Sequence, residues 1–202
     1  DLPHLEINSI PENEFPLYAH WSYDRIYRND MIKQPDVLML MFLYPDDFPK
    51  LVKKANYDYY EPRTIHESSL SPSVHSILAT ELGYHQQALD FFSYACRLDL
   101  DDYNNNTSEG LHITSIAAAW VNIVYGFAGL KTSGTMPSLS PYLPKLWKSY
   151  SFFITLFGNN IKIKVTKENI YITNNGNPFT FKIYGIPTEI NTGTTTLKNE
   201  RV

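Results

Sequence analysis

The sequence predicts a two-part α+β chain, in which a helical body precedes a small antiparallel β module. Charge-poor apolar helices are expected to begin near residues 35, 72 and 115, about 40 residues apart. From Trp147 onward apolar residues alternate with polar ones, which is the pattern of half-buried strands. A stretch rich in Ser, Pro and Gly, Lys131 to Pro144, separates the two patterns and predicts a linker.

The first 32 residues show neither a helical nor an alternating pattern. They contain three prolines and then an aromatic-rich stretch, 18–27, so we expect an irregular but packed segment. The first helix is predicted to start at Pro35 and to end before Pro45. Because this helix is apolar on every side, we expect it to be buried.

Four more helices follow in the predicted body. Residues 49–61 predict a half-exposed outer helix with Lys53 off its apolar stripe. Ser71 as N-cap and Pro72 at the first helical position predict a helix that Gly83 closes. Residues 85–97 predict an outer helix, and residues from about 115 to 125 predict an inner one. The stripe expected to face inward on that last helix comprises Ile116, Ala117, Trp120, Val121 and Val124.

Four strands are predicted in the β module, around residues 152–156, 161–165, 170–172 and 179–183. Turn-forming sequences rich in Asn and Gly separate them. We expect the apolar face of the module to pack on the helical body through Trp147 and Tyr150. The Thr-rich last dozen residues are expected to be loosely ordered.

Composition narrows the classes of function. The 202 residues carry 17 basic and 21 acidic side chains, a net charge of −4, so there is no basic field to attract nucleic acid or an anionic membrane. No apolar run reaches the roughly 20 residues of a membrane helix. Cys96 is the only cysteine, which excludes an internal disulfide and fits a reducing, cytoplasmic compartment.

Motifs for metal binding are incomplete. His66-Glu67-Ser68-Ser69-Leu70 has Leu where a zinc-binding helix needs its second His. The acidic stretch from Asp99 to Asn104 lacks the sixth-place Gly and the twelfth-place Glu of a calcium loop. We therefore expect no metal site, and a solvated acidic loop at 99–104.

Polar side chains collect immediately before each of the three inner helices. Lys33 and Gln34 precede the first, residues 66–71 the second, and residues 110–115 the third. Helix N-termini present unpaired N–H groups and a partial positive charge, so the hydroxyls, Gly, Lys and His gathered there favour an anion.

Each of these clusters also has a purely structural interpretation. Ser71, Thr114 or Ser115 could serve only as helix caps, Lys33 could be a surface lysine, and His112 a hydrogen-bonded core histidine. The occurrence of all three clusters at the same kind of position favours the anion site.

Six ordered motifs resemble glycoside hydrolase family 65, the family of maltose, trehalose, kojibiose and nigerose phosphorylases. They lie at Tyr23 to Arg28, Met31 to Leu38, Tyr59 to Arg63, His66 to Ser73, Leu98 to Asn104 and Gly110 to Ser115. The resemblance implies that residues 1–132 are the C-terminal part of an (α/α)6 catalytic barrel. It implies that residues 133–202 are a linker and a small antiparallel β-sandwich domain of jelly-roll type.

The resemblance also implies a reaction, the inverting phosphorolysis of an α-glucosidic disaccharide such as maltose to β-glucose 1-phosphate and a free sugar. Ser68, Ser69, Gly110 and His112 would then bind phosphate, and Lys33 and Gln34 would contact the glucosyl unit or the anion. The general-acid Glu of the family is expected upstream, so no catalytic residue is assigned in this chain. No cofactor is implied, inorganic phosphate being the co-substrate, and the full-length protein is expected to be a homodimer.

Two alternatives remain open. Helix pairs of about 40 residues also describe non-catalytic helical-repeat interaction modules, although the polar clusters at helix starts argue against one. A family hydrolase of trehalose type would not need phosphate, and Ser68, Ser69 and His112 favour a phosphorylase over it. Because the helices account for only part of a barrel and the chain begins without Met, we expect a missing N-terminal part of the same protein. The chain alone is expected to be inactive.

Overall fold

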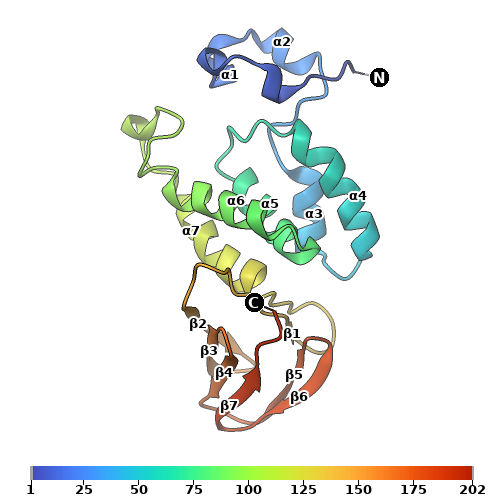
Figure 1. Ribbon diagram of the computed structural model, residues 1–202, viewed down its shortest axis with the longest axis vertical. Coiled ribbons are helices and arrows are strands. Elements are labelled where there is room, and N and C mark those ends of the chain that lie inside the picture. Colours follow the sequence, from blue (N-terminus) through green and yellow to red (C-terminus); the bar gives the residue numbers. More distant parts are fainter. Residues whose placement is uncertain (1, 202) are drawn as a thin grey trace. The chain divides into compact units, whose positions relative to one another are not determined.

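Helices occupy the first part of the chain and strands the second, in a computed structural model that describes residues 2–201 (Figure 1). The chain forms two compact units that divide between Trp120 and Val121. The predicted combination of a helical part and a sheet part is confirmed. None of the helices in residues 2–201 is both long and apolar enough to cross a membrane.

The N-terminal segment is built from single turns around a small core of its own. Two 3-10 turns, Ile7–Ser9 and Glu12–Glu14, precede the short helices α1 (Leu17–His20) and α2 (Tyr23–Tyr27). The core residues Leu17, Trp21 and Ile65 are surrounded by the partly buried side chains of Leu5, Ile7, Ile10, Phe15, Ile26 and Met31. The expectation of an irregular but packed segment is confirmed.

The remainder of the first unit contains the five predicted helices and two further 3-10 turns, Glu61–Arg63 and Thr107–Glu109. The helices are α3 (Asp36–Leu43), α4 (Lys50–Tyr60), α5 (Ser71–Leu82), α6 (His85–Arg97) and α7 (Ile113–Val121). Helix α5 forms the centre of the unit, since all of its residues from Ser71 to Thr80 are buried. Gly83 ends α5 as predicted, with φ at +95° and its N–H donating to Ala79 O at 2.9 Å.

Two helices expected to be buried have exposed apolar faces. In α3 only Leu38 and Met41 are buried, whereas Leu43 is 59% exposed. On α7 the predicted inward residues Ile116 and Trp120 are 54% and 48% exposed. Within residues 2–201 nothing covers these faces, so the prediction of full burial is wrong for the chain as it stands.

Lys53 and Ser71 lie in places that the sequence pattern does not reveal. Lys53 is 1% exposed, and its Nζ donates to Glu81 Oε1 at 2.8 Å, which ties α4 to α5. Ser71 is the first residue of α5 and not its N-cap, which is Leu70. The predicted cap is therefore wrong, because the Ser71 hydroxyl donates back to the preceding turn, at Ser68 O.

A π-helical segment, Asn122–Phe127, lies near the start of the second unit. The predicted linker after it is packed, because Leu139 and Leu143 are fully buried and strand β1 (Ser138–Leu139) lies within it. Tyr150 O–H donates to Phe127 O at 3.0 Å, and the Trp147 ring lies 5.1 Å from that of Phe127. Trp147 and Tyr150 thus contact the π-helical segment.

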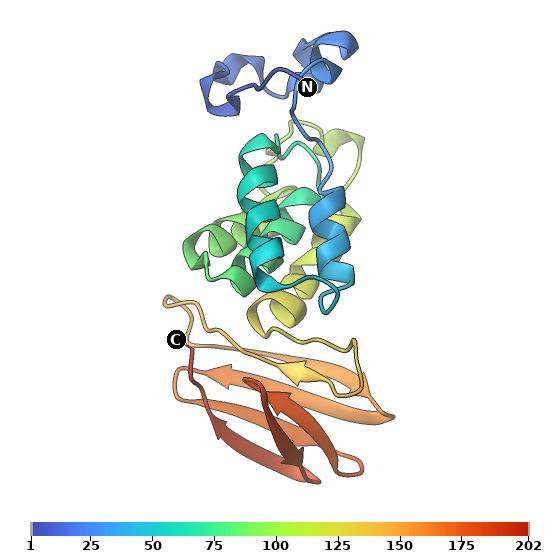
Figure 2. The same cartoon turned by 90° about the vertical axis from the view of Figure 1, so that its right-hand side faces the viewer.

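Two sheets make up the rest of this unit (Figure 2). Strands β2 (Ser149–Leu156), β3 (Asn159–Thr166), β4 (Asn169–Asn174) and β7 (Gly193–Lys198) form an antiparallel sheet in the order β2-β3-β4-β7. The second sheet has the order β1-β5-β6, with β5 at Phe179–Ile183 and β6 at Ile186–Ile190. Strand β1 pairs with β5 in parallel, so this sheet is mixed and not antiparallel throughout as predicted.

The C-terminal residues are ordered as strand β7, which contradicts the expectation of a loose tail. The strand pairs with β4 along its whole length, from Gly193 opposite Asn174 to Lys198 opposite Asn169. Threonine is β-branched and favours strands, so the Thr-rich composition fits this pairing better than it fits disorder.

Candidate functional site

An isolated parallel bridge brings the first two polar clusters together. Ile32 N–H donates to Arg63 O at 2.8 Å, and Ile65 N–H donates to Ile32 O at 3.0 Å. Because the two segments run in the same direction, Lys33 and Gln34 lie beside the residues that follow Ile65. The clusters before α3 and α5 are therefore neighbours.

Direct contact between these clusters is made by Ser68 and Gln34. Ser68 is buried, and its hydroxyl donates to Gln34 Oε1 at 2.9 Å and accepts from Leu70 N–H at 3.3 Å. Ser69, the next residue, is partly exposed. We call residues Ser68 to Leu70 the serine turn.

Lys33 and Glu67 both lie next to α1. Lys33 is exposed, and its Nζ lies 5.4 Å from the centroid of the Tyr18 ring. The Glu67 carboxylate accepts hydrogen bonds from the N–H groups of Leu17 and Tyr18. Glu67 therefore anchors the N-terminal segment to the serine turn by binding the first N–H groups of α1. Glu61, nearby in sequence, is partly buried, and this burial raises the pKa of its carboxyl.

The third cluster is organised by Asp99, which follows α6. Asp99 Oδ2 accepts from His112 N–H at 2.8 Å, and Oδ1 lies 2.5 Å from His112 Nδ1. The hydrogen bond from His112 lowers the pKa of the Asp99 carboxyl. A carboxylate partner makes Nδ1 the donor nitrogen, which leaves Nε2 as the ring atom for a ligand.

Two carboxylates of the acidic loop hold the loop that leads to the third cluster. Residues 99–103 are exposed or partly exposed, as expected of a solvated loop, but Asp99 binds His112 and Asp102 Oδ1 accepts from the N–H groups of Asn106 and Thr107 at 3.0 Å each. Ser115 is buried within α7, where its hydroxyl donates to Ala95 O at 2.9 Å, so it is not a cap. Gly110 has φ at +139°, a conformation that a side chain strongly disfavours.

Loops before α5 and α7 line one hollow of about 370 Å³. His66 and Glu67 come from the first loop and Tyr103 and Asn104 from the second, and Tyr94 of α6 lies between them in sequence. Tyr94 O–H donates to His66 O at 3.2 Å. His66 and Glu67 of the second cluster thus border the same space as residues 103–105, which precede the third cluster. Within residues 2–201 none of Ser68, Ser69, Gly110 and His112 lines this hollow, and no hydrogen bond joins His112 or Gly110 to Ser68 or Ser69.

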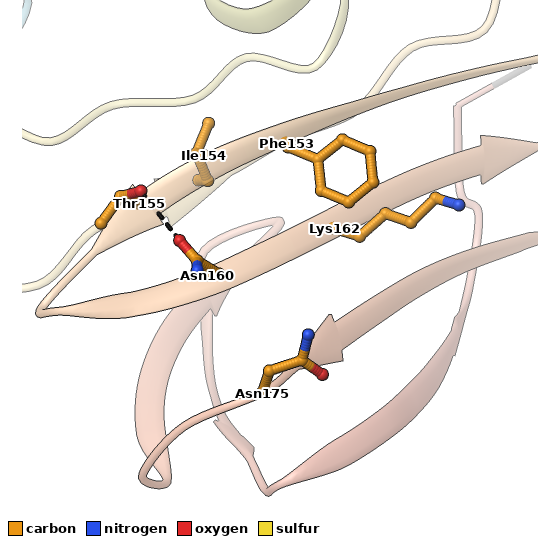
Figure 3. Close-up of a pocket in the computed structure, with 6 residues that line it drawn as sticks. All are labelled: Phe153, Ile154, Thr155, Asn160, Lys162 and Asn175. Carbon is orange, nitrogen blue, oxygen red and sulfur yellow. Dashed lines mark hydrogen bonds between the residues drawn. The ribbon is translucent and has the colours of Figure 1, made fainter.

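A second hollow, of about 350 Å³, lies on the sheet of the second unit (Figure 3). Phe153 of β2 faces Lys162 of β3, whose Nζ is 5.4 Å from the ring centroid, and Thr155 O–H donates to Asn160 Oδ1 at 3.1 Å. Its lining contains neither a carboxylate nor an imidazole, the groups used in acid–base cleavage of glycosides. We assign no reaction to it.

The sequence patterns located the clusters but missed the groups that hold them. The sequence indicates no role for Asp99, because no periodicity shows that it binds His112 in the same loop. His75, whose Nδ1 lies 2.8 Å from Ser71 O, appears only as one more residue of an apolar helix. In the part of the chain described, no group of three His, Cys, Asp or Glu side chains could hold a metal ion.

Comparison with known proteins agrees with both units. Residues 1–121 match the glycosyl hydrolase family 65 central catalytic domain, and residues 130–190 match the glycosyl hydrolase family 65 C-terminal domain. A structure described as a putative kojibiose phosphorylase from human microbiome is 53% identical, with a TM-score of 0.92 over 98% of this chain and 26% of that one.

Several curated relatives are named as phosphorylases. An α,α-trehalose phosphorylase of Thermoanaerobacter brockii is 48% identical over 82% of this chain, and a maltose phosphorylase of Bacillus subtilis is 44% identical over 90% of it. The chain spans only 21% and 24% of their lengths. The matched domains and these identities show that the chain belongs to glycosyl hydrolase family 65, of which it carries part of the central catalytic domain and the C-terminal domain.

Proposed function

We propose that this chain is the phosphate-binding part of a glycoside phosphorylase. The complete protein would cleave an α-glucosidic disaccharide with inorganic phosphate, with inversion, to β-glucose 1-phosphate and a free sugar. The observation that carries the proposal is the contact of Ser68 with Gln34, which joins the polar clusters before α3 and α5. The names of the relatives support the same reaction class.

Each candidate residue has a role that follows from its chemistry. The Ser69 hydroxyl is a neutral donor, and the Ser68 hydroxyl would become one by turning its hydrogen from Gln34 Oε1 to the anion. Gly110, whose N–H donates to Thr107 O at 3.1 Å, would leave open space for the anion because it has no side chain. His112 Nε2 adds a charge-assisted donor when the ring is protonated. Lys33 supplies a positive charge at the exposed rim, and Gln34 an amide that can bind a sugar hydroxyl. Bound phosphate would attack the anomeric carbon from the face opposite the leaving oxygen, which gives inversion.

The general acid is proposed to lie in a part of the protein that precedes this chain. Two uncovered apolar faces, on α3 and α7, support a larger helical body, which we propose is an (α/α)6 barrel. Leu43 is 59% exposed, and Ile113 on α7 is 67% exposed, values that a finished core does not show. The second unit would be the jelly-roll sandwich predicted from the sequence.

Other properties of the complete protein belong to the same proposal. We propose that it uses no cofactor and no metal, and that phosphate is its co-substrate. We also propose that it acts in the cytoplasm as a homodimer and binds neither nucleic acid nor membranes.

Product analysis tests the reaction. The complete protein is incubated with phosphate and, in turn, maltose, trehalose, kojibiose and nigerose, and the products are followed by 1H and 31P NMR. Phosphate-dependent formation of β-glucose 1-phosphate from one of them is the expected result. Release of two free sugars without phosphate would instead identify a hydrolase, and the α-anomer of the phosphate ester would contradict inversion.

A further inference from the structure

Two histidines and one serine lie next to the serine turn: Ser71 and His75 are buried, and His66 is partly exposed. His66 Nδ1 is 3.1 Å from Ser71 Oγ, and Ser71 Oγ donates to Ser68 O at 3.3 Å. His75 Nδ1 is 2.8 Å from Ser71 O. Ser71 and His75 are both fully buried, so water does not compete for the hydrogen bonds between them.

The direction of every proton in this cluster follows from its acceptors. A serine hydroxyl has one hydrogen, and the Ser71 hydrogen is used toward Ser68 O, so His66 Nδ1 must donate to Ser71 Oγ. A carbonyl can only accept, so His75 Nδ1 also donates. Both rings therefore carry their proton on Nδ1, and both Nε2 atoms are buried without a hydrogen-bond partner.

This arrangement fixes the orientation of one peptide group in the serine turn. The Ser68 carbonyl is tied toward Ser71, and in a trans peptide the next N–H points to the opposite side. That N–H belongs to Ser69. Ser69, which carries this N–H and a hydroxyl, is partly exposed, so both donors are available to an anion. The Ser68 carbonyl, which would repel an anion, points to the opposite side.

We propose that His66, Ser71 and His75 are positioning residues that orient the Ser68–Ser69 peptide for an anion. The proposal rests on the function proposed above, because it takes phosphate as the ligand of the serine turn. It assigns no contact with phosphate to these three residues. Their effect on phosphate is exerted only through the turn.

Ser71 and Ser76 provide a matched pair of variants on one helix. Both are buried residues of α5 whose hydroxyls donate to a backbone carbonyl, Ser71 to Ser68 O and Ser76 to Ala88 O at 2.8 Å. Ser71→Ala in the complete enzyme is expected to raise KM for phosphate about three- to ten-fold, the effect of losing one net hydrogen bond. KM for the disaccharide is expected to stay within about two-fold.

Ser76→Ala controls for stability. It is expected to lower Tm as much as Ser71→Ala does, with KM for phosphate unchanged. If both variants change the phosphate KM equally, or neither does, the positioning role is wrong. If Ser68→Ala with Ser69→Ala also leaves the phosphate KM unchanged, the proposed phosphate site itself is wrong, so the two failures are distinguishable.

His66 allows a rescue experiment, because its backbone has φ at +53°. Asn tolerates this conformation, and its side-chain N–H₂ lies near the position of His Nδ1, so His66→Asn keeps both the backbone and the donor. His66→Leu removes the donor. His66→Asn is expected to keep the phosphate KM nearer to that of the unmodified enzyme, and equal effects of the two variants would overturn the donor role of His66.

Nitrogen NMR of the imidazole groups tests the proton positions without any enzyme activity. In the complete protein, His66 and His75 are expected to give the signals of neutral rings protonated on Nδ1. Signals of the Nε2-protonated form from either ring would overturn the proposed hydrogen-bond directions.

Discussion

His66 and His75 illustrate how burial changes a titratable residue. Their ring centroids are 4.7 Å apart, and Phe91 and Tyr57 pack against them. Because the charged imidazolium is desolvated there, the pKa of His66 is lowered to about 3 and that of His75 to about 4. The Ser71 carbonyl, which accepts from His75, opposes this shift only in part.

The stability of the chain is predicted to fall as the pH drops from about 6.5 to about 4. In the unfolded chain both rings bind a proton below pH ~6.5, whereas in the folded chain they remain neutral until the lowered pKa values are reached. Urea midpoints measured at several pH values check this. The double variant His66→Asn with His75→Asn should flatten the pH dependence, and an unchanged dependence would contradict the assignment.

For single residues, the sequence identifies candidate site residues well but does not predict their hydrogen-bond or ion-pair partners. Ser68, Gln34 and His112 could be singled out because polar residues directly before apolar helices are unusual and match family motifs. Asp99 and Lys53 could not, because their partners are remote in the chain. A hydrogen bond across 13 residues, like the ion pair between two helices, depends on how the helices pack, which periodicity does not specify.

Among the helices, the contact of α4 with α5 contains the buried ion pair of Lys53 and Glu81. Lys53 is 1% exposed, and the Glu81 side chain is 26% exposed. Replacing Lys53 by an apolar residue removes an opposite charge from Glu81, so this pair contributes more to the contact of the two helices than a surface pair does.

Lys53→Met is predicted to lower the free energy of unfolding by about 3 kcal/mol, at the lower end of the range for buried pairs because Glu81 keeps some contact with water. Urea unfolding measures this. Lys54→Met is the matched control, since Lys54 lies next in sequence and pairs with Asp58 at the surface. It should change the midpoint little, and an equal effect of the two variants would argue against a buried pair.

Strands whose apolar residues alternate strictly, such as β3 and β4, were predictable, whereas β6 and β7 were not. Strand β7, Gly193–Lys198, contains Leu197 as its one large apolar residue, so no alternation marks it. Its place depends on the exposed edge of β4, which offers backbone groups to pair with. The helix starts and ends were predictable because Pro35, Pro72 and Gly83 determine the backbone conformation of the turn in which each lies, whatever the rest of the fold.

For the whole molecule, we predict that this chain alone catalyses no phosphorolysis. It spans 21% to 26% of the relatives described above, and the general acid is proposed to lie outside it. The chain is incubated with phosphate and each of the four disaccharides, and glucose 1-phosphate is measured. Clear turnover would contradict the location proposed for the acid.

The second unit is predicted to stabilise the enzyme without binding its substrates. Deleting residues 138–202 from the complete protein should lower Tm or solubility, with activity lost only as far as the protein unfolds. A deletion variant of equal stability but altered disaccharide preference would show instead that the unit has a binding role. The hollow beside Phe153 and Lys162 would then be the first place to examine (Figure 3).

The proposed binding of phosphate by Ser68, Ser69 and His112 can be tested by measuring KM separately for phosphate and for the disaccharide. In the complete enzyme, His112→Ala and the double variant Ser68→Ala with Ser69→Ala should each raise KM for phosphate about ten- to a hundred-fold, the effect of losing a charge-assisted hydrogen bond or a pair of donors. KM for the disaccharide should change much less. An unchanged phosphate KM in both variants would contradict the claim and remove these residues from the site.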